Sequence, residues 1–305
     1  MNKGIWLAIG AYAFWGLFPI YWKWLQAVPA LQLLGHRMVW SFVLLIGVVL
    51  ARRQWRAFRA ALTSRTLRIY FIAALLIGVN WFVYVWGVNA GHIVETSLGY
   101  FINPLLSVLL GVVVLRERLR PLQWVPIGLA GIGVLYLTIV YGAIPWISLI
   151  LAFSFGLYGL VKKTAPLNAL HGLTLETGIL FGPMLAYLIV VEFNGEGAFL
   201  HTGLLPDMLM IGAGIVTVIP LLMFASAARQ IPLTLVGILQ YIAPTGQFLL
   251  GVLVYGESFT RERLIGFTAV WLALAIFTAE NVWHRWQTQA TRARVQPTMI
   301  AEPDD

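Results

Sequence analysis

Four ionisable side chains stand inside otherwise apolar stretches of this 305-residue chain. His36 and Arg37 lie several residues into one stretch, Glu95 lies near the start of another, and Glu176 lies several residues into a third. Removal from water favours the neutral form of a carboxyl group, whereas a neighbouring cation favours its charged form. Pairing and separation of such groups can therefore release and take up protons, and imidazole titrates near neutral pH.

Depth along the apolar stretches suggests how these groups pair. Arg37 and Glu95 stand at one level, and we expect an ion pair between them. Glu176 stands near the opposite end, where its expected partners are Lys163, His171 or Arg229. Two interpretations remain open: proton-sensitive gates, or static pairs that fix helix packing. Under either one, loss of a single partner costs about 3–5 kcal/mol, because the other charge stays buried.

A second set of side chains combines aromatic rings with amides and hydroxyls. Apolar walls with a few polar groups suit a pocket for a small ligand, and aromatic faces favour planar or cationic ligands. Each residue alone could instead make a hydrogen bond between helices. The candidate substrate-binding residues are Trp15, Asn80, Trp81, Tyr84, Tyr100, Asn103, Tyr158, Gln240 and Tyr241, with Gln247 beside them.

The elements that must position these residues are membrane helices. Hydrophobic residues make up 60% of the chain and charged residues only 10%, against roughly 25% charged in soluble domains. Ten apolar stretches each approach the ~20 residues that cross a bilayer, and helices satisfy their own backbone there. We therefore expect an all-α polytopic membrane protein, with helices near 4–22, 30–51, 69–90, 93–115, 121–139, 143–161, 170–191, 208–228, 232–256 and 264–282.

The chain contains an internal repeat at an offset of 140 residues. The matched positions include Trp6 with Trp146, Gly16 with Gly156, Ile102 with Ile242, Pro104 with Pro244, Gly111 with Gly251 and Glu117 with Glu257. Five helices per copy is an odd number, so the second copy enters the membrane from the opposite side. The prediction is two inverted five-helix repeats, residues 1–140 and 141–283, followed by a disordered tail, residues 284–305.

Pro104 and Pro244 occupy matching depths in the fourth and ninth predicted helices. A proline inside a helix lacks an N–H and clashes with the preceding turn, so it kinks the helix. Freed carbonyls are tolerated in a membrane only beside protein or water. We predict that both kinked helices line a cavity between the repeats, where inverted-repeat transporters bind substrate and alternate access. A purely structural kink is the alternative.

The positions of the basic residues along the chain predict its orientation in the membrane. The net charge is +8, yet sixteen of the twenty Lys and Arg residues fall in loops and tails on one predicted side. This asymmetry follows the positive-inside rule and places both termini in the cytoplasm. The lipid bilayer, and not nucleic acid, is the expected partner.

Several classes of chemistry have no matching motif. We find no H-E-x-x-H, no G-x-S-x-G and no phosphate loop, so we expect no metal or cofactor. An intramembrane enzyme acting on a lipid-soluble substrate is the alternative, and a channel is the third reading. Energy would come from an ion gradient, with protons favoured, or from the gradient of the substrate. An amino acid, a drug-like aromatic or another metabolite stays open as substrate, as does monomer against homodimer.

Four segments carry a family resemblance: HRMVWS, ETSLGYFINPLLSVLLGVVVLRE, YGLVKK and QYIAPTGQFLLGVLVYGE. Together they resemble the RarD-type proteins of the EamA family, in the drug/metabolite transporter superfamily, over about residues 3–283. The resemblance implies ten helices in two inverted repeats in the bacterial inner membrane. It also implies secondary transport of a small organic metabolite or drug, usually by export.

Overall fold

The computed structural model describes residues 2–90, 92–142 and 144–256, together with 264–265, 268–269, 271–277, 279–280 and 283. All regular structure in these residues is helical. Seven of the helices are long and apolar enough to cross a membrane. The expected class, an all-helical multi-pass membrane protein, is confirmed.

The helices follow the order of the expected spans. The first half contains α1 (Lys3–Trp24), α2 (Ala30–Ala51), the short α3 (Trp55–Ala60), α4 (Ser64–Asn89), α5 (Ile93–Val113), η1 (Pro121–Gln123) and α6 (Trp124–Tyr141). The second half contains α7 (Trp146–Thr164), α8 (Ala169–Phe193), α9 (Leu204–Gln230), α10 (Leu233–Leu239), α11 (Ile242–Leu249) and η2 (Leu250–Val254).

The number of spans stays a prediction at ten. Besides the seven membrane-length helices, two shorter apolar helical stretches cover Leu98–Val113 and Pro121–Tyr136. The tenth expected span, 264–282, is described only in the pieces 264–265, 268–269, 271–277 and 279–280, and the expected tail 284–305 lies outside the described residues.

The chain divides into two compact units. The larger unit comprises Met1–Glu117 and Tyr141–Phe259, and it contains every candidate site residue. The smaller unit comprises Arg118–Val140 and Thr260–Asp305, and within it Arg120 binds Glu280 at 3.1 Å. The site is therefore built entirely within the larger unit.

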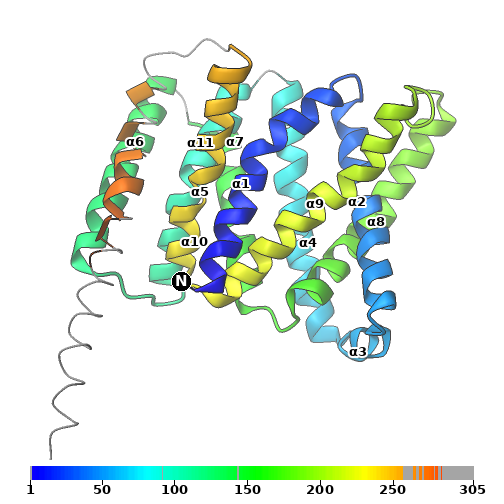
Figure 1. The fold of residues 1–305 in the computed structure, drawn as a ribbon, viewed down its shortest axis with the longest axis horizontal. Helices are drawn as coiled ribbons and strands as arrows, with labels where there is room; N and C mark the ends of the chain where they lie inside the picture. The colour runs from blue at the N-terminus through cyan, green and yellow to red at the C-terminus, as the bar shows by residue number, and fades with distance from the viewer. Residues whose placement is uncertain are drawn as a thin grey trace, which may run out of the picture. The chain divides into compact units, whose positions relative to one another are not determined.

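In the larger unit, helices from the first half of the chain pack mainly on helices from the second half. Helix α1 packs on α9 and α11, and α2 packs on α8 and α9 (Figure 1). An offset of 140 residues maps α1, α2, α4 and α5 onto α7, α8, α9 and the α10–α11 segment. The mapped contacts, α7 on α4 and α5, and α8 on α4, are also present. An inverted repeat would produce this symmetry of contacts.

Glycines set the closest helix crossings. A Cβ built on Gly246 would lie 3.2 Å from the Cα of Gly16, where α11 crosses α1. A Cβ on Gly214 of α9 would lie 2.6 Å from the backbone carbon of Trp40 in α2. The hydroxyl of Ser41 donates to the Gly214 carbonyl at 3.4 Å. Without a hydrophobic force between helices in lipid, such close backbone contact is a main source of their association.

The two repeat-related prolines sit in different backbone settings. Helix α5 runs through Pro104 without a break, whereas the segment containing Pro244 is divided between α10 and α11. Because Pro244 has no N–H, it cannot bond the Gln240 carbonyl in the helical manner. That carbonyl accepts instead from Ala243 at 3.2 Å. The division places Gln240 directly after the end of α10, between the two helical segments.

Gly214→Ala should weaken the α2–α9 crossing. The new methyl group would overlap backbone atoms of Trp40, so we expect a loss of about 1–3 kcal/mol in the free energy of unfolding. SDS titration of the purified protein in mixed micelles measures this loss. Gly47→Ala in α2 is the matched control, since nothing lies within 4 Å of its new methyl group. Equal stability of the two variants would contradict the tight crossing.

Candidate functional site

An internal cavity of about 140 Å³ lies within the larger unit, among α1, α2, α4, α5, α7 and the α10–α11 segment. Protein cavities of about 150 Å³ can hold a molecule the size of benzene. The helices around it come from both halves of the predicted repeat. The cavity is therefore large enough for a small aromatic ligand or for the head of a larger one.

Most of the predicted substrate-binding residues line this cavity. Side chains from four separate helical segments converge on it, which the sequence pattern alone predicted. They are Trp15, Asn80, Trp81, Tyr84, Tyr100, Asn103 and Gln240, together with Gln247. From the predicted gating and kink residues, Arg37 and Pro244 also contribute to the lining.

Two predicted ligand residues lie outside the lining. Tyr241 is buried, and its hydroxyl donates to the Phe101 carbonyl at 3.2 Å, which ties the start of α11 to α5. Tyr158 is fully buried and bonds Glu176. Both tyrosines hold helices together in this structure and do not face the cavity.

Helix α1 supplies a lining that the sequence interpretation largely missed. Besides Trp15, its Tyr12, Phe18, Pro19 and Trp22 line the cavity. Residues three or four apart share a helix face, so Trp15 itself marks the face on which Tyr12, Pro19 and Trp22 stand. That spacing was the available signal.

Aromatic contacts fix the walls of the cavity. The Trp15 ring lies 5.5 Å from the Tyr12 ring and 5.9 Å from the Phe155 ring, centroid to centroid. Tyr84 and Tyr100 meet edge to face at 5.7 Å. These separations are in the favourable range for ring pairs. The wall is therefore a packed aromatic surface.

The four amides of the cavity divide into two kinds. Asn80 donates to the Leu151 carbonyl at 2.8 Å and to Ser154 at 3.0 Å, and Gln247 donates to the Trp15 carbonyl at 3.0 Å. These two amides connect helices. The side-chain oxygens of Asn103 and Gln240 are buried and accept no hydrogen bond from the described part of the chain. A buried acceptor without a donor is costly, so these two oxygens are suited to a ligand.

Arg37 is the one charged residue among those that line the cavity. Its Nε donates to Thr217 at 3.1 Å, and its guanidinium lies 4.8 Å from the Trp22 ring and 4.5 Å from the Trp81 ring. No carboxylate pairs with it among the residues whose side chains the structure describes. The side chain of its predicted partner, Glu95, lies outside the described residues.

His36 stands apart from its neighbour in sequence. It is buried, its ring lies 4.9 Å from the Phe199 ring, and it does not line the cavity. The His36 side chain, a predicted gating residue, therefore does not contact the cavity in this conformation.

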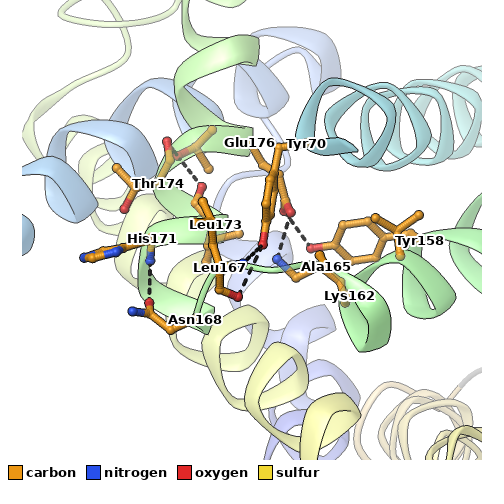
Figure 2. Close-up of polar contacts among 12 residues, drawn as sticks. Tyr70, Tyr158, Lys162, Ala165, Leu167, Asn168, His171, Leu173, Thr174 and Glu176 are labelled. Carbon is orange, nitrogen blue, oxygen red and sulfur yellow. Dashed lines mark hydrogen bonds and ion pairs between the residues drawn. The ribbon is translucent and has the colours of Figure 1, made fainter. Parts of the chain in front are cut away.

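A buried ion pair occupies the end of α7 (Figure 2). Lys162 donates to one carboxylate oxygen of Glu176 at 2.8 Å, and Tyr158 donates to the other at 3.0 Å. Lys162 is 3% exposed and Glu176 is 1% exposed, so both charges are removed from lipid and water. The Lys162 ammonium also lies 5.6 Å from the Tyr70 ring. Each charge is thus neutralised within the protein.

The predicted partners of Glu176 were wrong. Lys163 donates to the carbonyls of Ala228 and Ile231, at 3.2 and 2.7 Å. His171 bonds Gln54, and Arg229 donates to the carbonyls of Ala165 and Leu167. Adjacent helical residues differ by about 100° in direction, so Lys162 faces α8 while Lys163 faces the end of α9.

Glu117 anchors the start of α10. Its two carboxylate oxygens accept from the backbone N–H groups of Leu233 and Thr234, at 2.7 and 2.9 Å. Lys163 lies 3.9 Å from the same carboxylate. A carboxylate at a helix N-terminus satisfies backbone donors that have no partner in the helix. Glu117 therefore holds the start of α10, and Lys163 of α7 lies close enough to offset its negative charge.

These features define a multi-pass helical membrane protein with a ligand-sized, aromatic and amide-lined cavity. The sequence pattern of the EamA-like transporter family matches residues 2–139. Protein RarD of Streptomyces exfoliatus is 46% identical over 303 residues, which cover 99% of this chain and 96% of the relative. An uncharacterized transporter of Vibrio cholerae is 46% identical over 283 residues, covering 92% and 93%. The chain therefore belongs to the EamA-like transporters of the RarD type, as the sequence motifs predicted.

A solved structure has the same fold. It is described only as the crystal structure of a protein, and it matches with a TM-score of 0.67 at 18% identity. The match covers 91% of this chain and 98% of that one. Helix packing of this kind is therefore shared well beyond the close relatives, while the family membership makes this chain a membrane transporter.

Lys162→Met should destabilise the protein strongly. The change leaves the Glu176 carboxylate buried without its cation, at an expected cost of about 3–5 kcal/mol in the free energy of unfolding. Replacing both partners, as Lys162→Met with Glu176→Leu, should recover much of that loss, because no unpaired charge remains. SDS titration of four proteins, the parent, Lys162→Met, Glu176→Leu and the double variant, tests this. A double variant as unstable as the sum of the single changes would contradict the pairing.

Proposed function

We propose that this chain is a secondary transporter that carries a small organic metabolite or drug through the central cavity by alternating access. The observation that carries the proposal is that residues from both predicted repeats line the cavity. Tyr84 and Asn103 come from the first predicted repeat, whereas Leu151 and Gln240 come from the second. A site shared by two inverted units can open to one side as it closes to the other.

The aromatic walls and the two unpaired amide oxygens support the assignment of this cavity as the substrate site. Rings such as Trp15 and Tyr100 offer broad contact area, and Asn103 and Gln240 offer directional polar contacts. This combination is typical of pockets for small organic molecules. Export from the cytoplasm, with both termini on the cytoplasmic side, is part of the proposal and follows from the family resemblance and the basic loops.

Polar contacts tie helix ends together at the end of the larger unit where α1 begins. There Glu117 holds the start of α10, and Lys163 holds the end of α9. Arg229 holds the loop between α7 and α8 through the carbonyls of Ala165 and Leu167. We infer that these polar contacts form the closed gate of this state and must break when the cavity opens to that side.

Proton coupling through Glu176 extends the same proposal. The carboxylate is buried and depends on Lys162, so a movement that separates the two would favour its protonation. A pH gradient should then drive uptake by wild-type vesicles but not by vesicles containing Glu176→Gln. Uptake that ignores the gradient in both proteins would reject the coupling.

Asn103→Ala and Asn80→Ala should separate substrate binding from helix packing. Asn103→Ala removes an unpaired amide, so stability should change by no more than about 0.5 kcal/mol while counterflow falls about tenfold. Asn80→Ala removes two bonds between helices and should cost about 0.6–1.7 kcal/mol of stability.

The flux measurement needs a substrate, which a screen of melting temperature across metabolites supplies. Proteoliposomes preloaded with that substrate then report counterflow. Normal counterflow by Asn103→Ala would remove the cavity from the transport path. Absence of saturable counterflow by the wild-type protein would overturn the carrier assignment itself.

Glu117→Gln should loosen the closed end. Weakening this gate by about 1.4 kcal/mol would raise the open fraction about tenfold. The chain has no native cysteine, so a single Thr234→Cys substitution reports on the gate directly. Its buried position should react slowly with maleimide in the parent protein and about tenfold faster with Glu117→Gln. Exposed Gln230→Cys is the matched control and should react alike in both; an unchanged Thr234→Cys rate would contradict the gate.

A further inference from the structure

Arg37 presents a cation to the cavity that the described protein does not neutralise. Its guanidinium has five N–H donors, and the structure uses one of them, the Nε group on Thr217. The rings of Trp22 and Trp81 lie near the guanidinium at 4.8 and 4.5 Å. Aromatic faces attract a cation, but they accept no in-plane hydrogen bonds. The donors at the guanidinium edge are therefore available to a ligand.

The repeat shows what is missing beside Arg37. At an offset of 140 residues, Glu176 corresponds to His36 and Lys162 corresponds to Trp22. The second half thus carries a complete ion pair at a place where the first half carries an indole ring and an imidazole. The cation of the first half, Arg37, stands next to this place and faces the cavity. Among the described residues that line the cavity, none supplies an anion to Arg37.

We propose that the cavity binds a planar organic anion, whose carboxylate pairs with Arg37 and whose body lies against the aromatic wall. This proposal rests on the transport function proposed above and specifies the substrate class for the same site. Guanidinium and carboxylate form two parallel hydrogen bonds with a fixed geometry. The Trp22 and Trp81 rings, at 4.8 and 4.5 Å, and the bond from Nε to Thr217 restrict the guanidinium before a ligand arrives.

The unpaired amides refine the class. Asn103 and Gln240 line the same cavity, and their buried side-chain oxygens accept no bond from the described residues. They favour a ligand with a hydroxyl or N–H donor on the part of its body remote from the carboxylate. A cavity of about 140 Å³ accommodates one aromatic ring with such substituents. A purely cationic ligand, which aromatic walls alone would favour, is repelled by the charge of Arg37.

A series of three ligands of equal shape tests the sign of the preferred charge. Benzoate, benzamide and benzamidine are planar and nearly isosteric, and at neutral pH they carry one negative, no and one positive charge. The melting temperature of the full-length protein in detergent should rise with benzoate at millimolar concentration and stay constant with benzamidine. 4-Hydroxybenzoate should bind more tightly than benzoate. Equal shifts with all three, no shift with benzoate, or a preference for benzamidine would overturn the proposal.

Variants at Arg37 connect the preference to that side chain. Arg37→Gln should weaken benzoate binding about tenfold or more and remove the difference between benzoate and benzamide. Arg37→Lys keeps the charge but not the paired geometry, so the preference for the anion should persist at lower affinity. Arg56→Gln, on the exposed face of α3, is the control and should bind benzoate as the parent does. Anion preference that survives Arg37→Gln unchanged would overturn the assignment.

Glu95→Gln tests whether the protein itself supplies the anion. If the cavity charge is open to a ligand, this change should leave benzoate affinity within about twofold. A gain of tenfold or more would show that Glu95 neutralises Arg37, and the proposal would fall. Saturable counterflow of another substrate, without any anion preference, would remove the proposed class and leave the transport function standing.

Discussion

Every buried charge in a bilayer must find its counter-charge or its hydrogen bonds inside the protein, and this constraint organises the larger unit. Lys162 and Glu176 meet it with each other, and Glu117 meets it at the start of α10. Lys163 meets it largely with backbone carbonyls at the end of α9. The first contact joins the consecutive helices α7 and α8, whereas the contacts of Glu117 and Lys163 join segments that are distant in sequence. The polar groups therefore determine which helix ends are held together, while apolar packing provides the bulk of the contact area.

Close backbone contact and an interrupted helix make room for the cavity inside this packed unit. Gly16 and Gly246 let α1 and α11 approach until their backbones nearly touch. Just before that contact, the α-helical hydrogen-bond pattern is interrupted between Leu239 and Ile242, where Pro244 cannot bond the Gln240 carbonyl. The crossing and the interruption together turn Gln240 and Gln247 toward the cavity. Polar groups that lipid would reject are thus placed inside the protein, where Gln247 bonds the Trp15 carbonyl and the Gln240 oxygen has no partner among the described residues.

The helices and much of the lining were predictable, while the ion pairs were not. Apolar length gave the spans, and polar residues in those spans, such as Asn80 and Gln240, marked the cavity because lipid excludes them. The partner of Glu176 depended on how α7 is rotated about its axis. Side chains of successive helical residues point in directions about 100° apart. Sequence depth alone could not separate Lys162 from Lys163. The same rotation turned Tyr158 into the ion pair and away from the lining.

If the chain works by alternating access as proposed, the contrast between the two halves would give a physical reason to close only around a bound substrate. The ion pair of Lys162 and Glu176 is already neutral, so its dry surroundings cost little further. If Arg37 faces water in the open cavity, closing around a lone guanidinium would cost several kcal/mol. A bound carboxylate, as proposed above, would cancel that cost through paired hydrogen bonds. The empty cavity would then resist closure, the occupied one would not, and movement of the two halves would be tied to the presence of substrate.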